Sequence, residues 1–373
     1  MHEIKFIHTS DLHLGRKYKY LGEVAHKAQS HLIDIMMKIA SIAIEKKVDF
    51  VFISGDLFDN ETPSSFLIAK FMDFVDLLSA KNIQIVILPG THDSSLGNSL
   101  YSKHSVFTEN KNVFVFIDKV TNKFIFQDKS IAVYGNCYPG KSSPILGFQR
   151  DSSVNYHVIL AHGSLQIEGK SDKNDSPILI SDIDSSFADY IALGHWHNYY
   201  SIKSNVPCFY SGSPELIDKD QINSGYIIYG CLGNNSKFEP IHVGERRFDD
   251  IKIDISNVTK ITELIQKIKK GSDENLIRRI DLWGTKKGEL IGFNFSKLKE
   301  ELLSLFYYLI IEDHSSFILS TNSFSKNFSS IEKIYYERLS NLIKNASSQE
   351  DKEKYSRALE MGIALLSGNE DVI

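Results

Sequence analysis

The stretch Leu88-Pro89-Gly90-Thr91-His92-Asp93 follows a nearly continuous apolar run that begins at Ile83, and it places a histidine beside a carboxylate in a turn. Such an apolar run is typical of a strand that is buried in a parallel sheet. The same order, a strand followed by Gly, Asp or His, recurs at Asp11-Leu12-His13, Gly55-Asp56, Ala161-His162-Gly163 and Gly194-His195-Trp196-His197. The pattern predicts that several strands deliver reactive side chains to their own carboxyl ends.

The first ninety residues alternate between apolar strands and amphipathic helices. This alternation favours buried strands with largely parallel pairing. We expect strands at 4–9, 48–53 and 83–88, and helices at about 28–47 and from a turn at Thr62-Pro63 to about residue 80.

Shorter strands follow, and helices are scarce among them. We therefore expect a second, more antiparallel sheet that faces the first, in an α/β fold with a four-layer α/β/β/α sandwich. These strands are predicted at 113–117, 123–126, 131–134, 157–160, 190–193, 208–210 and 226–229.

A change in composition near Glu245 predicts the end of the first domain, which we place at residues 1–247. A small α+β unit is expected at 248–319, a Ser/Asn/Phe-rich linker at 320–330 and two amphipathic helices within 331–373. The apolar faces of these helices can pack on the preceding domain or bind a partner helix in a groove. The linker favours the partner.

The composition is that of an ordinary globular protein, with 42% hydrophobic and 24% charged residues among 373. The net charge of -5 gives no overall basic signal, so contacts with nucleic acid would need local basic patches. Three widely spaced cysteines favour a reducing compartment. No signal peptide or membrane-spanning run is seen, which predicts a cytoplasmic protein without membrane contact.

The strand-end side chains have the composition of a two-metal phosphoesterase site. Two neighbouring metal ions can supply a hydroxide and stabilise the charge of a phosphoester transition state. Taken singly, each motif could be an ordinary turn or a buried histidine, but five in one order favour a metal site. We expect Asp56 to bridge two ions, with Asp11, His13 and His197 on one and Thr91, His162 and His195 on the other. Mixed nitrogen and oxygen donors favour manganese, iron or zinc over magnesium.

These five motifs resemble those of the calcineurin-like metallophosphoesterases. Within that superfamily, the stretches at 8–15, 54–59 and 210–214 resemble the SbcD-type nuclease subunit of DNA double-strand-break repair. The resemblance implies a manganese-dependent exonuclease or endonuclease that acts on DNA ends. It also implies a homodimer joined to an SbcC-type coiled-coil ATPase, with the unit up to residue 319 as a capping domain.

The resemblance makes His92 the candidate catalytic residue, which positions the scissile phosphate and assists the leaving oxygen. Asp93 is the expected orienting partner of His92, and Asp59 is expected just outside the metal ligands. Thr91 departs from the family, which normally has asparagine there. Because a hydroxyl is a poorer donor than an amide oxygen, we predict weaker binding of the second metal.

Local basic groups beside the site, Arg16, Lys17 and Lys19, are candidate DNA-binding residues, and Tyr18 and Tyr20 lie between them. A second basic group is scattered over residues 267–287, where solvated lysines are an equally good explanation. Two other functions stay open. One is a metallophosphodiesterase or phosphatase for non-DNA substrates, and the other is a catalytically weakened subunit that binds DNA ends as a scaffold.

Overall fold

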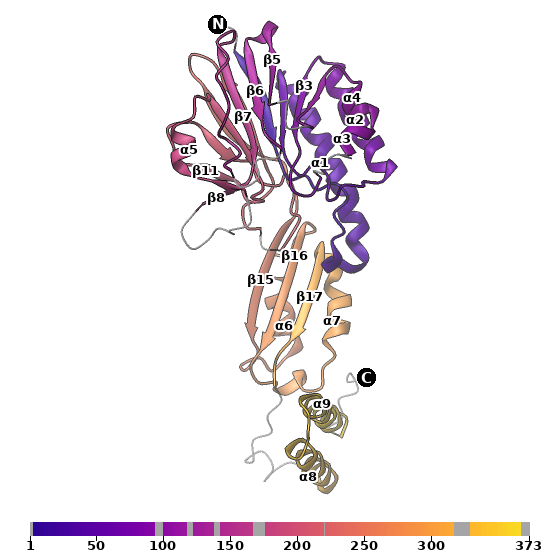
Figure 1. Cartoon of the computed structure of the whole chain (residues 1–373). Coiled ribbons are helices and arrows are strands. Elements are labelled where there is room, and N and C mark those ends of the chain that lie inside the picture. The colour runs from indigo at the N-terminus through magenta and orange to yellow at the C-terminus, as the bar shows by residue number, and fades with distance from the viewer. Residues whose placement is uncertain are drawn as a thin grey trace. The chain divides into compact units, whose positions relative to one another are not determined.

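A computed structural model describes residues 3–93, 100–117, 122–137, 142–166, 176–219, 221–316 and 329–366. The chain divides into two compact units, residues 1–246 and 247–373 (Figure 1). None of the helices in the described ranges has the length and apolarity needed to cross a membrane.

The first sheet of unit 1 has the strand order β14-β13-β1-β2-β3-β4. The four strands from β1 to β4 are parallel, whereas β13 is antiparallel to β1 and β14 to β13. Their bounds are β1 Ile4–Thr9, β2 Phe50–Ser54, β3 Gln84–Leu88, β4 Val113–Val115, β13 Tyr226–Leu232 and β14 Lys237–His242. The predicted parallel arrangement of the first three strands is confirmed.

The second sheet has the order β11-β12-β10-β7-β6-β5. Its four inner strands are parallel and only the two outer pairs are antiparallel, so the expectation of a more antiparallel sheet is wrong. Parallel strands need long crossovers, and here these are mostly irregular segments, which left no helical pattern in the sequence. The bounds are β5 Lys123–Phe126, β6 Ile131–Gly135, β7 Tyr156–His162, β10 Tyr190–Gly194, β11 Tyr200–Ile202 and β12 Cys208–Tyr210.

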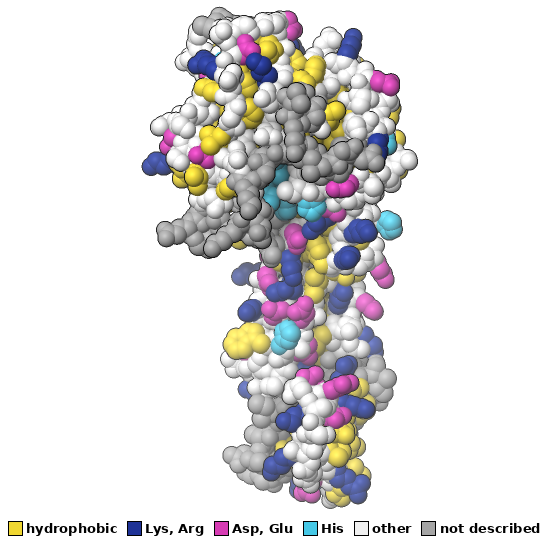
Figure 2. All heavy atoms as spheres, viewed as in Figure 1, with side chains coloured by type: hydrophobic (Ala, Val, Ile, Leu, Met, Phe, Trp, Pro, Cys, Tyr) yellow, Lys and Arg dark blue, Asp and Glu magenta, His cyan; other side chains and the backbone are white. Residues whose placement is uncertain are grey.

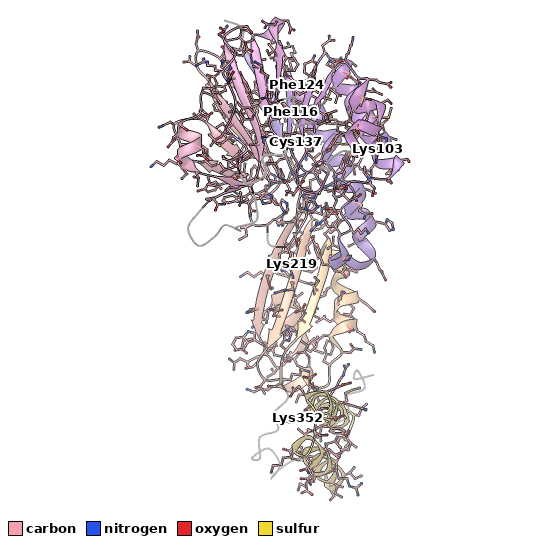
Figure 3. All side chains as sticks on the ribbon, in the orientation of Figure 1. Lys103, Phe116, Phe124, Cys137, Lys219 and Lys352 are labelled. Carbon is pink, nitrogen blue, oxygen red and sulfur yellow. The ribbon has the colours of Figure 1, made fainter. Side chains whose placement is uncertain are left out.

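The two sheets face each other across an apolar core that includes Phe52, Leu160 and Tyr190. Phe116, Phe124 and Cys137, labelled in Figure 3, belong to this layer or pack against it. Helices α1 (Ala25–Glu45) and α2 (Ser65–Ser79) lie on the side of the first sheet (Figure 1). The short α5 (Ile180–Asp184) lies beside the second sheet. The α/β class with a four-layer arrangement is therefore confirmed.

Smaller elements complete unit 1. The cap of α2 is Ser64, whose hydroxyl accepts a hydrogen bond from the Leu67 amide, rather than the predicted Thr62-Pro63 turn. The remaining helices and strands are α3 Leu100–Lys103, α4 Ser105–Thr108, β8 Ser164–Leu165 and β9 Pro177–Ile178.

Unit 2 contains a parallel three-stranded sheet of β15 (Arg247–Asp254), β16 (Leu276–Trp283) and β17 (Tyr308–Asp313). Helix α6 (Ile261–Lys269) joins β15 to β16, and α7 (Phe295–Leu302) precedes β17. These helices and strands bury a core of their own.

Two further helices, α8 (Ser330–Lys344) and α9 (Gln349–Leu366), pack against each other. The Tyr335 hydroxyl on α8 donates to the Ala358 carbonyl on α9 at 2.7 Å. In α9, Glu360 pairs with buried Lys286 at 2.8 Å and accepts a hydrogen bond from the Gly292 amide. Helix α9 therefore contacts the preceding sheet unit, while Ile331 and Ile334 of α8 remain exposed.

Candidate metal centre

The carboxyl ends of strands from both sheets of unit 1 meet at one place. A Cβ atom on Gly55 would lie 1.9 Å from Nδ1 of His162, and one on Gly194 would lie 1.8 Å from the carbonyl oxygen of Ser54. Neither position has room for a side chain. Glycine at these two strand exits therefore allows the sheets to approach until their polar side chains share one site.

Four of the predicted site residues have a left-handed backbone: Asp11 (φ 52°), His13 (φ 45°), Asp56 (φ 51°) and His195 (φ 99°). Residues other than glycine rarely adopt this conformation. Where it occurs, the surrounding structure must hold it, and it is frequent at functional sites. The strand ends are thus bent to turn these side chains inward.

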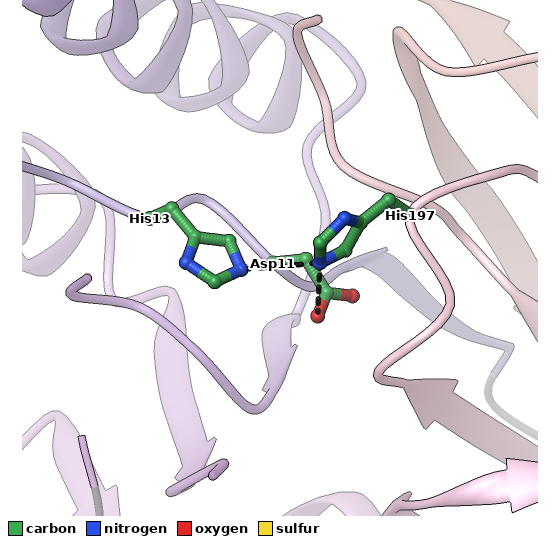
Figure 4. A group of neighbouring side chains, drawn as sticks. All are labelled: Asp11, His13 and His197. Carbon is green, nitrogen blue, oxygen red and sulfur yellow. Dashed lines mark hydrogen bonds and ion pairs between the residues drawn. The ribbon is translucent and has the colours of Figure 1, made fainter. Parts of the chain in front are cut away.

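Three overlapping groups of side chains bring their potential ligand atoms within 4.8 Å of one another. Asp56 belongs to two of the groups, and its Oδ2 lies 3.4 Å from Nε2 of His162 and 3.7 Å from Nε2 of His13. The groups are Asp11, His13 and His197 (Figure 4), Asp11, Asp56 and His162, and His13, Asp56 and His92. Histidine side chains also gather on the face of unit 1 seen in Figure 2. The sequence thus correctly predicted which strand ends would converge.

The hydrogen bonds of the histidines decide which ring nitrogens are free to bind a cation. Nδ1 of His13 lies 3.1 Å from the Asp59 carboxylate and Nδ1 of His162 lies 3.0 Å from the Ser54 carbonyl. Both oxygens only accept, so each Nδ1 carries the proton and each neutral ring directs a lone pair from Nε2. Nε2 of His162 is buried and has no hydrogen bond among the described residues.

Lone pairs that face the Asp56 carboxylate repel it unless a positive charge lies between them. This donor set of imidazole nitrogens and carboxylate oxygens fits a divalent metal, and the orienting bonds from Asp59 and Ser54 are those that metal-binding histidines usually have. Asp11, His13, Asp56, His162 and His197 would hold the metals.

The charge balance agrees with this fit. Burial alone would raise the pKa of the Asp56 carboxyl, but His162 and His13 hold that pKa well below its usual range. Burial would lower the pKa of His162, yet the Asp56 carboxylate beside it raises the pKa to about 10. Burial lowers the pKa of His197 to about 4, which leaves a neutral ring, as metal binding requires. The centre therefore demands a positive charge, which a proton or a metal can supply.

The other predicted ligands of the second metal lie around Asp56 and His162. The Thr91 hydroxyl lies 3.4 Å from Oδ2 of Asp56. The His195 ring lies 5.2 Å from the His162 ring, centre to centre, and the His195 amide donates to Oδ1 of Asp11 at 3.1 Å. Neither residue belongs to the three groups above, although both border them.

His92 lies in the third group, and its backbone amide donates to Oδ1 of Asp56 at 2.8 Å. Its ring centre is 4.7 Å from that of His13, and its Nδ1 lies 3.3 Å from the carbonyl oxygen of Asp59. The orienting partner of the ring is therefore the Asp59 backbone and not Asp93.

Asp93 has a different task from the one predicted. It is fully buried and accepts hydrogen bonds from the Gly90 amide (2.8 Å), the Phe58 amide (3.1 Å) and the Tyr101 hydroxyl (2.6 Å). Burial, followed by the nearby Asp56 carboxylate, raises the pKa of Asp93. These three bonds fix the turn that presents Thr91 and His92, so Asp93 acts on the backbone rather than on the His92 ring.

The predicted basic patch is divided by the structure. Lys17 and Lys19 are exposed, but the Arg16 guanidinium pairs with Asp59 at 3.2 Å and with Asp218 at 3.1 Å. Tyr18 is buried, and its hydroxyl donates to the Leu216 carbonyl. Arg16 is thus engaged in holding the carboxylate that orients His13.

The second basic group is also partly unavailable at the surface. Arg278 and Lys286 are buried, with Arg278 held by Asp249 at 2.7 Å and Lys286 by Asp313 at 2.9 Å. A charged residue in the sequence cannot be assigned to solvent or to an ion pair without knowledge of its partners.

One polar residue of the site was not predicted. The Ser10 hydroxyl donates to Oδ2 of Asp11 at 2.5 Å and lies 2.9 Å from the Ser211 hydroxyl. It thereby restrains a carboxylate that would bind metal. The only signal in the sequence was that Ser10 and Ser211 both stand directly at strand exits.

The family model described as calcineurin-like phosphoesterase matches residues 4–199, and the chain belongs to that family. This range contains all five strand-end motifs. The family binds divalent metal ions and hydrolyses phosphoesters, in agreement with the donor set.

Among individual relatives, the chain is 25% identical over 234 residues to a DNA double-strand break repair protein Mre11 of Thermoplasma acidophilum, covering 60% of this chain and 59% of that protein. It is 22% identical over 282 residues to an uncharacterized metallophosphoesterase, YhaO, of Bacillus subtilis, covering 71% and 67%. It is also 24% identical over 284 residues to SbcD, the smaller-lettered component of the nuclease SbcCD of Escherichia coli, covering 64% and 67%. The matched part is thus less than two thirds of the length of the Mre11 relative.

Proposed function

We propose that this chain is a two-metal-dependent nuclease that hydrolyses phosphodiester bonds at DNA ends, as the nuclease subunit of an SbcCD-like complex. The observation that carries the proposal is the cluster in which Asp56 joins ligand groups from both sheets. The family membership supports phosphoester hydrolysis, and the Mre11 and SbcD relatives favour DNA as the substrate.

In this proposal Asp56 bridges two ions, with Asp11, His13 and His197 around one of them. The second ion takes Thr91, His162 and His195. Manganese is our choice of metal, with iron or zinc as alternatives, because imidazole and carboxylate ligands suit all three. When bound, the metals would supply a hydroxide and neutralise charge on the phosphate.

His92 is the proposed catalytic residue. The Asp59 carbonyl can accept a hydrogen bond from Nδ1 of the ring, which leaves Nε2 to hold a proton for the leaving oxygen. Its place in a group with His13 and Asp56 puts that proton beside the metal centre. Lys17 and Lys19, and Arg16 if it exchanges its carboxylate partners for phosphate, are proposed to bind the DNA backbone.

The remaining assignments extend the same proposal. Residues 1–247 would form the nuclease domain, 248–319 a capping domain that contacts DNA, and 320–330 a linker. The helices within 331–373 would bind an SbcC-type coiled-coil ATPase, a role that the exposed Ile331, Ile334 and Leu342 of α8 suit. We further propose a homodimer that works in the cytoplasm.

The test compares linear duplex and hairpin DNA with a generic phosphodiester dye, each with Mn²⁺. Wild type, His92→Ala and His26→Ala are measured, since His26 is exposed and lies outside the three ligand groups. We expect DNA cleavage by the wild type and the His26 variant and its loss in His92→Ala. Dye hydrolysis without DNA cleavage would favour the phosphodiesterase or phosphatase alternative. DNA binding without any hydrolysis would favour the scaffold.

A further inference from the structure

A pocket of about 360 Å³ adjoins the metal centre, and the role proposed for the metal ligands leaves it without a function. Two of its lining residues are His195 and His197, and the others are Trp196, Asn198, Asp218 and Gln221. A phosphate at the metal centre would therefore place the rest of its own nucleotide at the mouth of this pocket. The volume is at the lower end for small-molecule sites and suits one nucleotide rather than a duplex.

The indole of Trp196 is held rigidly in the pocket wall. One face stacks on Tyr210, with ring centres 4.7 Å apart and planes within 16°, and Tyr200 meets it edge-on at 5.8 Å. The indole Nε1 donates to the Ser164 hydroxyl at 3.1 Å. Trp196 nevertheless remains partly exposed. A fixed, partly exposed aromatic ring is the feature on which unpaired bases stack.

The polar groups of the pocket favour a base over a second phosphate. Gln221 is 7% exposed, and its Oε1 accepts from the Ile217 amide at 2.9 Å, whereas its amide nitrogen has no partner in the described ranges. A buried donor of this kind is satisfied by a ligand carbonyl or ring nitrogen. The carboxylate of Asp218 would repel a phosphate but accept a hydrogen bond from a base amino group.

We propose that this pocket holds the nucleobase next to the scissile phosphate and that Trp196 stacks on that base. The inference rests on the proposed function and sharpens its substrate to a nucleotide whose base is unpaired. Trp196 is then a positioning residue that determines specificity. A tryptophan that only packs in the core would instead contribute to stability without distinguishing substrates.

Fluorescence tests the contact without any turnover. The chain has two tryptophans, and Trp283 is 49% exposed in unit 2, so Trp283→Phe leaves Trp196 as the sole reporter. The probes are thymidine 5′-monophosphate and deoxyribose 5-phosphate, both with Mn²⁺. We expect saturable quenching by the nucleotide, at least about tenfold tighter than any effect of the sugar phosphate. Equal responses to the two probes would overturn the proposal.

A kinetic measurement follows on two p-nitrophenyl phosphodiesters, one of thymidine and one of methanol. The ratio of their kcat/KM values should fall about tenfold in Trp196→Leu and recover in Trp196→Phe, while hydrolysis of the methyl ester stays near the wild-type value. An unchanged ratio in Trp196→Leu would refute the base contact. DNA cleavage with an unchanged ratio would sink the pocket alone, and a base-dependent ratio without DNA cleavage would sink the nuclease alone.

Discussion

Replacing Thr91 by asparagine should strengthen the binding of one of the two metals. The Thr91 hydroxyl lies 3.4 Å from Oδ2 of Asp56, in the turn that Asp93 fixes. Two oxygen ligands of one ion, each about 2.1 Å from it, are separated by about 3 Å when they meet at a right angle. The hydroxyl is therefore near a ligand position, but it is a weak neutral donor. The amide oxygen of asparagine reaches one bond farther and carries more negative charge.

The expected gain follows from what single contacts contribute at metal sites. Losing a residue that only orients a ligand typically costs 10- to 100-fold in metal affinity. A ligand atom exchanged for a better one should be worth at least the lower end, about tenfold, or about 1.4 kcal/mol. The affinity of the tighter ion should not change, because the Thr91 side chain is near the Asp56 oxygen that His162 faces.

Calorimetric titration of the EDTA-treated protein with Mn²⁺ measures both affinities. We expect two unequal sites in the wild type, a weaker site about tenfold tighter in Thr91→Asn, and no change in Thr62→Asn, which alters an exposed threonine. Two equally tight ions in the wild type, with no effect of Thr91→Asn, would show that the hydroxyl is no handicap and would refute the reasoning.

Three further predictions concern ionised groups that the structure pairs. Without metal, the pKa of about 10 for His162 exceeds the ordinary 6.5, so its pairing with Asp56 should stabilise the fold fully below about pH 6.5 and be lost towards pH 10. Urea midpoints across this range should fall in EDTA, and the same fall in His162→Asn would contradict this origin. Asp93→Asn should cost about 2 kcal/mol, measured by urea unfolding, because an amide offers one oxygen to three donors. Lys286→Met should cost about 3 kcal/mol and loosen α9, measured by unfolding and hydrogen exchange, since it leaves Glu360 without its buried partner. An equal effect of Lys287→Met, at an exposed neighbour, would contradict that cause.

Local patterns were enough to predict most elements of the chain. The strands at 4–9, 123–126 and 208–210 have the predicted bounds, and the two C-terminal helices begin within one residue of expectation. Apolar periodicity acts over a few residues, so it is visible in the sequence. The direction of the strands in the second sheet was predicted wrongly, because long irregular crossovers carry no periodic pattern.

Short strands without a clear pattern were also missed. β14 alternates between partly and fully exposed residues, and β17 is only partly buried, so neither has the apolar run of an inner strand. An edge strand is stabilised by pairing with one neighbour, and this pairing depends on a segment distant in the sequence.

By itself, the sequence determined the chemistry available at the strand ends. Asp11, His13, Asp56, His162 and His197 could be singled out because each stands directly after a buried strand, and parallel strands end at a common edge. The turn at Gly90-Thr91-His92-Asp93 could likewise be recognised as part of the site from its residue types.

Only the tertiary structure decided what each of these side chains contacts. It gave the His92 ring to the Asp59 carbonyl, Asp93 to the backbone of its own turn, and Arg16 to two carboxylates. It also placed Trp196 in the wall of a pocket beside the metal ligands. The physical reason is that hydrogen bonds and ion pairs act over about 3 Å in space, between residues that the sequence separates by tens or hundreds of positions.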